Sequence, residues 1–375
     1  MVYLDHQAST PMHPAAFAAL CAALQEFIGN PHASEHAAGW AASEAIENAR
    51  LAIAVAVGGD ADEIVFTSGA TEANNLALLG ASSPTGGRNR IVVTSIEHKA
   101  VLGPARELAR LGFELAIAPA GRDGSVDIDR LNQLIDARTL IVSTMLVNNE
   151  TGVVQPVEEV GRAASAAGAL LHVDAAQALS WMKIDAPALG ADLVSVSGHK
   201  MGGPKGIGAL WIRREIRDRV RPILHGGEQE NGLRPGTLPV PLCVSFGEAC
   251  RNLPSSAEVE SWRARTARLQ AGLLAIFSNA FVNGAEQSRH PGAISLTAPG
   301  IDAEILVAQL QPNVAISRGS ACTSGIPEPS HVLRAMGMSA EECNATFRVS
   351  TGRFTTDDDV SKALGYFEEV LTRNH

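Results

Sequence analysis

Between residues 64 and 212, short apolar and β-branched runs alternate with longer segments whose apolar residues recur at helical spacing. The expected strands cover residues 64–66, 91–93, 115–118, 140–146, 170–173 and 193–196. The expected helices cover residues 71–79, 101–111, 129–135 and 156–167. This alternation predicts an α/β fold in which helices cover both faces of a mainly parallel sheet.

The regions on either side of this alternation predict a second, smaller domain. Helical patterns at residues 14–27 and 34–57 precede it, and an irregular loop rich in proline and glycine follows at residues 233–239. An amphipathic helix at residues 259–277 then opens a region of short strands and helices that ends in an acid-started helix from Asp357. A chain of 375 residues is long enough for two domains. We expect a large domain of residues 13–253 and a small α+β domain of residues 1–12 and 254–375.

Composition excludes several classes of function. The formal net charge is -10 and no block of Lys or Arg occurs, which argues against nucleic acid as a direct ligand. No apolar run approaches the roughly 20 residues of a membrane span, and the N-terminus lacks the features of a signal peptide. Five cysteines without a C-x-x-C pair suit reduced thiols in the cytoplasm. No metal site is expected.

Polar side chains follow several of the expected strands. Ser197-Gly198-His199-Lys200 comes after the strand at 193–196, and Asp174 ends the strand at 170–173. In open α/β sheets, ligands bind at the carboxyl ends of the strands. A lysine in a confined site there can lose hydration and form a Schiff base, and a carboxylate can hold a pyridinium nitrogen protonated. Taken singly, Lys200 could be a surface lysine and Asp174 a helix cap.

Three further stretches carry candidate groups. Thr67-Ser68-Gly69-Ala70-Thr71-Glu72 joins a strand to a helix, and its small residues favour a phosphate at the helix N-terminus. Glu97-His98-Lys99 and Asn148-Asn149-Glu150 follow two other strands, although such turns are common without a ligand. Cys322 lies in the small, polar stretch at residues 318–325, where a nearby cation could favour its thiolate.

Eight motifs in one order identify a family resemblance. They are TSGATEANNLAL, SIEHKAVL, LVNNETGVVQP, HVDAAQA, SVSGHKMGGPKGIGAL, RPGTLP, RGSACTSGIPEPSHVLRAMG and FRVSTGRFTT. Together they resemble the NifS/IscS group of cysteine desulfurases, within the class V aminotransferase-like enzymes that use pyridoxal 5'-phosphate (PLP). The resemblance runs over essentially the whole chain. It implies PLP fold-type I, the aspartate aminotransferase-like architecture.

The resemblance implies a role for each matching residue. Lys200 would carry PLP, Asp174 would pair with the ring nitrogen, and Gln177 would bind the ring oxygen. His98 would stack on the ring, and Asn149 would support ring and substrate. The phosphate would be held by Ala70, Thr71, Ser197 and His199, with Thr237 supplied by the second subunit of a homodimer. Arg348, helped by Asn30, would bind the carboxylate of the substrate.

The implied activity converts L-cysteine to L-alanine and a persulfide on Cys322. Lys200 would take the α-proton, and His98 would move protons near the thiol. The persulfide would pass to a protein sulfur acceptor in iron–sulfur assembly, in tRNA or cofactor thiolation, or in DNA phosphorothioation. His6-Gln7, Gly325 and the short tail after Phe354 depart from the housekeeping members, which puts the iron–sulfur scaffold partner in doubt.

Three other functions fit parts of the same pattern. A selenocysteine lyase would keep the fold and the lysine but would favour selenium. Another class V aminotransferase would not need Cys322. A non-catalytic scaffold would show no absorbance from bound PLP, and it agrees least with the residues present.

Overall fold

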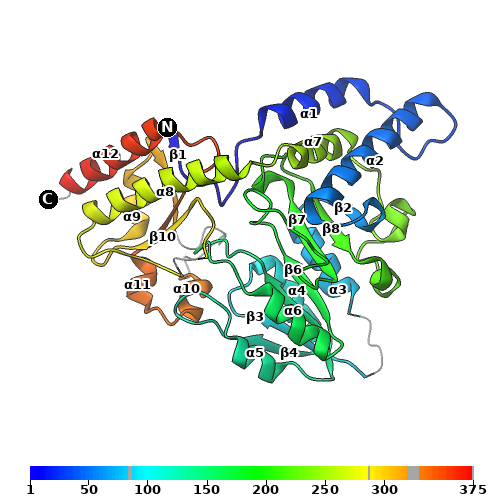
Figure 1. The fold of residues 1–375 in the computed structure, drawn as a ribbon, viewed down its shortest axis with the longest axis horizontal. Helices are drawn as coiled ribbons and strands as arrows, with labels where there is room; N and C mark the ends of the chain where they lie inside the picture. Colours follow the sequence, from blue (N-terminus) through cyan, green and yellow to red (C-terminus); the bar gives the residue numbers. More distant parts are fainter. Residues whose placement is uncertain (83–86, 286–287, 319–328, 374–375) are drawn as a thin grey trace.

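A seven-stranded sheet forms the centre of the larger part of the molecule (Figure 1). The structure is a computed structural model that describes residues 1–82, 87–285, 288–318 and 329–373. In spatial order the strands are β2 (Ile64–Thr67), β8 (Gly208–Ile212), β7 (Leu193–Ser197), β6 (Leu170–Asp174), β5 (Thr139–Met145), β3 (Arg90–Thr94) and β4 (Glu114–Ala118). Strand β8 pairs antiparallel with both β2 and β7, and the other described pairs in this sheet are parallel. The expected α/β fold with a mainly parallel sheet is therefore confirmed.

Helices cover both faces of this sheet, because its strands are apolar on both sides. On one face, residues such as Val93 and Leu210 pack against α3 (Ala70–Gly80) and α4 (Lys99–Arg110). On the other face, residues such as Phe66 and Val173 pack against a second group of helices. That group comprises α2 (Ala37–Val57), α5 (Ile128–Leu134), α6 (Val157–Ala166) and α7 (Val240–Arg251), with α1 (Pro14–Glu26) outside α7.

Helices α2 and α7 differ from the sequence-based expectation in ways that the structure explains. Helix α2 begins at Ala37 rather than near Ser34, because the side chain of His36 accepts a hydrogen bond from the Gly39 N–H and caps the helix there. Helix α7 was not among the expected helices, and its sequence contains Pro241 and Gly247. Proline is tolerated in a first helical turn. A Cβ at Gly247 would approach Ala49 Cα to 2.6 Å, so α2 and α7 can pack closely only with glycine here.

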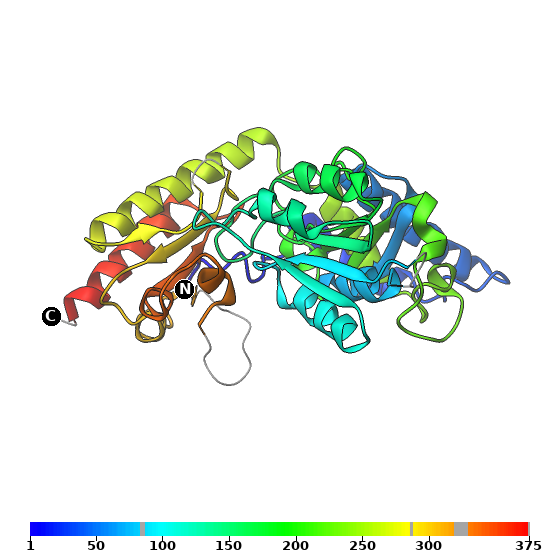
Figure 2. The same cartoon turned by 90° about the horizontal axis from the view of Figure 1, so that it is seen from below.

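A second, smaller sheet lies beside the large one (Figures 1 and 2). Its strand order is β12 (Ser317–Arg318), β13 (Thr346–Ser350), β10 (Ala293–Thr297) and β9 (Phe281–Val282), all antiparallel. One separate apolar core joins this sheet to α8 (Ser256–Ile276), α9 (Ala303–Gln309) and α12 (Asp357–Arg373). Figure 2 shows the resulting two lobes. The domain boundary near residue 253 stays a prediction.

The first residues of the chain join the two lobes. Strand β1 (Val2–Tyr3) pairs with β11 (Val314–Ala315), and Asp5 bridges to Ser350 of β13. The chain then passes Lys200, at the end of the short 3-10 helix Gly198–Lys200 that follows β7. Between α9 and α12 lie two short helices, α10 (His331–Ala335) and α11 (Ala340–Asn344). Residues 7–9 therefore lie between the two sheets, beside the ends of β6 and β7.

Within the described ranges, none of the helices is both long and apolar enough to span a membrane.

Candidate functional site

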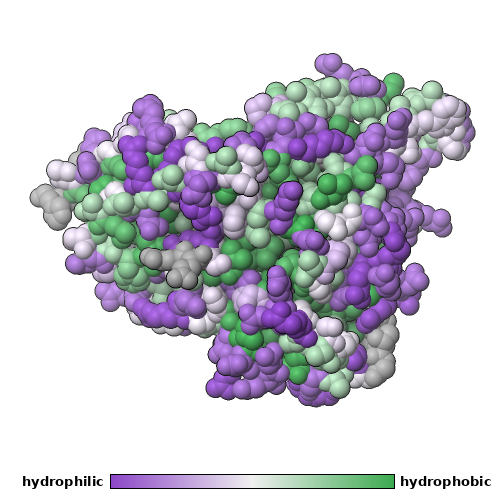
Figure 3. Space-filling model, in the orientation of Figure 1, coloured by the Kyte–Doolittle hydropathy of each residue, from purple (hydrophilic) through white to green (hydrophobic). Residues whose placement is uncertain are grey.

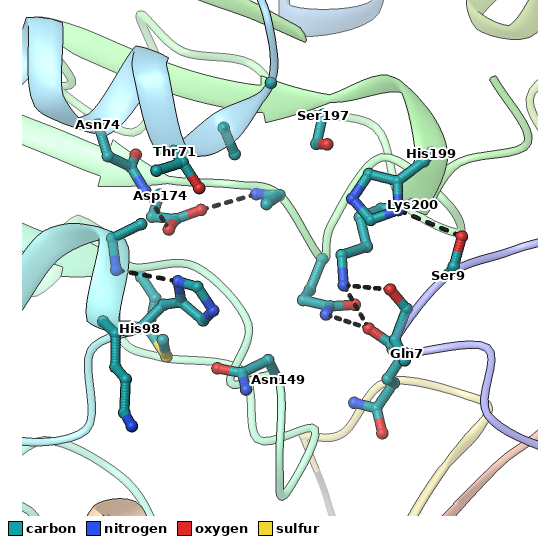
Figure 4. Close-up of a pocket in the computed structure, with 18 of the residues that line it drawn as sticks. Gln7, Ser9, Thr71, Asn74, His98, Asn149, Asp174, Ser197, His199 and Lys200 are labelled. Carbon is teal, nitrogen blue, oxygen red and sulfur yellow. Dashed lines mark hydrogen bonds between the residues drawn. The ribbon is translucent and has the colours of Figure 1, made fainter. Parts of the chain in front are cut away.

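A cavity of about 630 Å³ opens at the carboxyl ends of the parallel strands (Figure 4). Its walls come from the first residues of the chain, the N-termini of α3 and α4, the ends of β5, β6 and β7, and β13. The structure brings together here the predicted site residues Ala70, Thr71, His98, Asn149, Asp174, Gln177, Ser197, His199, Lys200 and Arg348.

Lys200 reaches the N-terminal segment of the chain. Its Nζ donates hydrogen bonds to the carbonyl oxygen of Gln7 at 2.6 Å and to that of Ala8 at 2.9 Å (Figure 4). The Gln7 carbonyl also accepts a hydrogen bond from Gln177 Nε2 at 2.9 Å. The amine is therefore held inside the cavity by a fixed piece of backbone.

Asp174 is a buried carboxylate with two fixed partners. It ends β6, and its Oδ1 accepts a hydrogen bond from the Ala176 N–H at 3.0 Å. Its Oδ2 accepts a hydrogen bond of 2.7 Å from Asn74 Nδ2, on the first turns of α3. Asn74 is fully buried, and it was not among the predicted site residues. Asn74 could have been predicted from its position four residues after Ala70, because residues at this spacing lie on the same face of a helix.

His98 presents a neutral ring to the cavity. It caps α4, and its Nδ1 accepts a hydrogen bond from the Ala100 N–H at 3.1 Å, which leaves Nε2 to carry the proton. Burial lowers the pKa of His98; the Asp174 carboxylate opposes this shift, and the Lys200 ammonium adds to it. Figure 4 shows the ring on the same side of the cavity as Asp174.

The side of the cavity beside α3 is suited to an anion. Gly69 has a φ of 149° at the turn from β2 into α3, a backbone conformation that residues other than glycine rarely adopt. The first N–H groups of a helix lack intrahelical partners and favour a negative charge. Ser197, His199 and Lys205 line the same cavity. Burial, followed by the charges of Lys200 and Lys205, lowers the pKa of His199 to about 4.

Arg348 is oriented by partners from both lobes. Its Nη1 donates to the Asn149 carbonyl and its Nη2 to Asp5 Oδ1, each at 2.7 Å. Ser317 Oγ donates a hydrogen bond of 2.6 Å to Asp5 Oδ2. Asp5 was not predicted as a site residue, because its position at the start of the chain gives no sign of a partner more than 300 residues away. The guanidinium is buried, yet its Nε is unpartnered among the described residues.

Three predicted residues are not among those that line the cavity. Asn30 lies between α1 and α2, and Thr237 lies before α7; both are exposed on the surface of this chain. Cys322 lies outside the described residues. Pro329 and His331, which come next in the described chain, line the cavity.

Several buried polar atoms around the cavity have no hydrogen-bond partner within the described ranges. They are Nε2 and Oε1 of Gln7, Asn74 Oδ1, Asn149 Oδ1 and Arg348 Nε. Buried polar groups in folded proteins nearly always have partners, so this concentration indicates a polar ligand. The amine, the carboxylate, the neutral imidazole and the helix N-terminus together fit a phosphorylated pyridine aldehyde such as PLP. In the described part of the chain, no group of metal-binding side chains is assembled.

Comparison with known proteins gives consistent results. The model of the aminotransferase class-V family matches residues 2–363. A mitochondrial cysteine desulfurase of Arthroderma benhamiae is 42% identical over 376 aligned residues, which cover 99% of this chain and 74% of the relative. A solved structure of a NifS-like protein superposes with a TM-score of 0.92 at 32% identity and covers 99% of both chains. The structure of SspA in complex with cysteine superposes with a TM-score of 0.84 at 34% identity, covering 95% of this chain and 100% of the other.

Proposed function

The chain belongs to the aminotransferase class-V family and is a cysteine desulfurase, and on this premise we propose that it binds PLP through Lys200 and transfers sulfur from L-cysteine to Cys322. The observation that supports this most is the meeting of Lys200, Asp174 and His98 in one cavity with Arg348. Enzymes of this family depend on PLP, and their fold is the expected PLP fold-type I.

The residues around the cavity fit the parts of PLP. Asp174 Oδ1 and Oδ2 already accept hydrogen bonds and can accept another from a protonated ring nitrogen. We assign Gln177 to a hydrogen bond with the ring oxygen and His98 to stacking on the ring face. Asn149 is assigned to contacts with both the ring and the substrate. The phosphate is assigned to Ala70, Thr71, Ser197 and His199. When bound, PLP supplies a sink for the electron pair left by the broken Cα–H bond.

The chain's own groups then carry the proton and sulfur steps. Arg348 binds the α-carboxylate of L-cysteine. Lys200 Nζ, once the substrate amine has displaced it, takes the α-proton and later returns a proton to Cα. The Cys322 thiolate attacks the substrate sulfur, so that a Sγ–S bond forms and the substrate C–S bond breaks. The electron pair of that C–S bond stays on Cβ, which takes a proton and becomes the methyl group of alanine. We assign the movement of protons near the thiol to His98, whose neutral ring carries its proton on Nε2.

The described cysteines are poor alternatives to Cys322. Burial raises the pKa of the Cys243 thiol to about 12 and raises the pKa values of Cys250 and Cys343 as well. A buried thiol with a raised pKa is a weak nucleophile at neutral pH. Cys21 is exposed on α1, and neither it nor the three buried cysteines line the cavity. All four thiols are free, which suits the reducing cytoplasm we propose as the site of the reaction.

We further propose that the enzyme is a homodimer and hands the persulfide to a protein acceptor. The exposure of Asn30 and Thr237 supports the dimer, because both residues match site positions of the family but do not line the cavity of their own chain. A second copy could bring them to the cavity. Iron–sulfur assembly, tRNA or cofactor thiolation and DNA phosphorothioation remain candidate destinations for the sulfur.

Incubation with L-cysteine and PLP tests the proposal, with alanine and the mass of the Cys322 peptide as readouts. We expect Cys322→Ser to stop sulfur transfer but to keep the absorbance of bound PLP, whereas Lys200→Ala removes both. Cys21→Ser is the matched control and should behave as the wild type. Alanine formation by Lys200→Ala at the wild-type rate would rule out the role given to this lysine.

A further inference from the structure

Gln7 places an unused amide in the wall of the cavity. Its side chain is almost completely buried, with 1% exposure, yet neither Nε2 nor Oε1 has a hydrogen-bond partner among the described residues. Because both atoms are unpartnered, either orientation of the amide offers one N–H donor group to the cavity. Leaving such a group buried and unpaired is unfavourable. A ligand that accepts a hydrogen bond would remove this cost.

The backbone of Gln7 is fixed on both sides, so the amide is positioned before any ligand binds. Its N–H donates to Ser350 Oγ at 2.9 Å, and its carbonyl accepts from Lys200 Nζ and Gln177 Nε2. These contacts tie Gln7 to strand β13 on one side and to the lysine on the other. A group held in this way loses little further freedom on binding.

The position of Gln7 relative to Arg348 indicates what it binds. Ser350, which accepts from the Gln7 N–H, lies two residues after Arg348 on β13, and alternate residues of a strand face the same side. Both residues line the one cavity, and each carries a buried N–H donor without a partner among the described residues, Nε2 of Gln7 and Nε of Arg348. Figure 4 shows the Gln7 side chain extending from the lysine toward the part of the cavity where Asn149 lies.

We propose that Gln7 Nε2 donates a hydrogen bond to the α-carboxylate of the amino-acid substrate, alongside Arg348 Nε. A carboxylate offers two acceptor oxygens and no donor, which matches two unpaired N–H groups. The positive charge of Arg348 is already paired with Asp5, so a neutral amide adds a donor without burying a second charge. Gln7 thereby favours substrates that carry a carboxylate over simple amines. This inference rests on the proposed function, because it assigns a specificity residue within the same site.

The test compares two ligands that differ only in the carboxylate. Dissociation constants of L-alanine and ethylamine are measured on the PLP-loaded enzyme through the absorbance of bound PLP, and the KM for L-cysteine is measured in parallel. In Gln7→Met, which keeps the length of the side chain but lacks the donor, we expect L-alanine to bind about 10- to 100-fold more weakly. Ethylamine should bind as it does to the wild type. Gln7→Glu should weaken L-alanine further, because it sets a negative charge against the carboxylate.

Gln155→Met is the matched control, because Gln155 is also buried but its amide is fully used. Its Oε1 accepts from the Val126 N–H, and its Nε2 donates to the Gly124 carbonyl. This variant should lower the melting temperature without changing the affinity for L-alanine. If Gln7→Met does not fold, Gln7→Asn serves the same comparison, since it keeps the amide but withdraws it by one methylene.

Two results would overturn the inference: no change in L-alanine affinity, or an equal loss for L-alanine and ethylamine. The second would show that Gln7 acts on PLP or on the shape of the cavity. Failure of the proposed function gives a different result, in which the wild-type protein itself binds no PLP or forms no alanine.

Discussion

Asn74 links helix α3 to the carboxylate at the end of β6, and this contact predicts a role in PLP binding. Its Nδ2 donates to Asp174 Oδ2, so it holds the carboxylate in place. Asn74→Ala should weaken PLP binding by about 10- to 100-fold, the usual effect of losing a hydrogen bond to a charged group. Equilibrium dialysis of PLP measures this change.

The neighbouring Asn75 provides the control. It is half-buried, and its Nδ2 donates only to the Thr71 carbonyl one helical turn earlier. Asn75→Ala should therefore leave PLP affinity unchanged. Equal losses in the two variants would mean that α3 as a whole was disturbed and that the Asp174 contact has no special effect.

Glu97 is a buried carboxyl that should make the protein less stable as the pH rises. Burial raises its pKa from 4.5 to about 8, although hydrogen bonds from Thr94 and Met145 oppose the shift. Between about pH 4.5 and pH 8 the folded protein keeps a proton that the unfolded chain has lost, so the free energy of unfolding falls with rising pH in this window. His172, whose pKa burial lowers to about 4, acts in the opposite sense between pH 4 and 6.5.

Glu97→Gln removes this contribution, because the amide resembles the protonated carboxyl. Urea unfolding at a series of pH values should show the variant gaining on the wild type from about pH 4.5 to about pH 8, with little further change above. The buried histidines affect both proteins alike, so only the difference between the two curves is informative. If the free energies of unfolding of the two proteins changed in parallel with pH, Glu97 would be ionised in the folded protein over the whole of this pH range.

At the scale of secondary-structure elements, apolar periodicity predicted most of the large sheet. The strand of residues 193–196 was expected and is observed as β7, Leu193–Ser197, because a buried parallel strand is apolar on both faces. The carboxyl ends of such strands meet at one edge, so the strand pattern alone is enough to place Asp174 and Lys200 together. Helix α7 could not be predicted, since its stability comes from packing on α1 and α2.

The cavity was predictable only where a residue carries a recognisable motif. Asp5, Gln7 and Asn74 act through partners about one hundred residues away or more, and no local pattern records such contacts. Asn30 and Thr237 were predicted from the family resemblance, but a single chain does not bring them to its cavity. Sequence patterns therefore found the groups at strand ends and missed those that depend on tertiary contacts.

The segment before α7 is held to the sheet by a buried ion pair. Arg50 of α2 makes two hydrogen bonds to Glu230, of 2.8 and 2.7 Å, and Glu230 also accepts from the Phe66 N–H. Glu230 and Asn231 both have positive φ values, so these contacts stabilise an otherwise unfavourable backbone. Breaking one partner of a buried pair leaves the other charge uncompensated.

Glu230→Gln should therefore lower the free energy of unfolding by about 3–5 kcal/mol. Urea denaturation measures the loss. Glu47→Gln is the control, because Glu47 also pairs with Arg50 but is exposed, and such a contact contributes less than about 1 kcal/mol. Similar losses in both variants would contradict the importance assigned to burial.

At the scale of the whole molecule, the surface over α1 and the start of α2 is unusually apolar. Phe17, Leu24, Ile28 and Trp40 are exposed there, Ile28 by 87%. Figure 3 shows apolar residues along the edge of the molecule where Figure 1 places α1. Exposed apolar surface on this scale is typical of interaction sites. Asn30 lies next to it in sequence, which supports the proposed homodimer with residues shared between its subunits.

Mixing two impaired variants tests whether Thr237 acts in the partner's site. In Lys200→Ala the chain keeps Thr237, and in Thr237→Ala it keeps Lys200, so a mixed dimer contains one site with both groups intact. We expect weak PLP binding and low activity from Thr237→Ala alone, none from Lys200→Ala, and recovery after the two are unfolded and refolded together. Closed twofold symmetry limits the recovery to about one site in each mixed dimer.

Adding Ile28→Asp to both chains should abolish this recovery of activity, since a charge in an apolar interface opposes association. Full activity of Thr237→Ala by itself, or no recovery in the mixture, would place Thr237 outside a shared site.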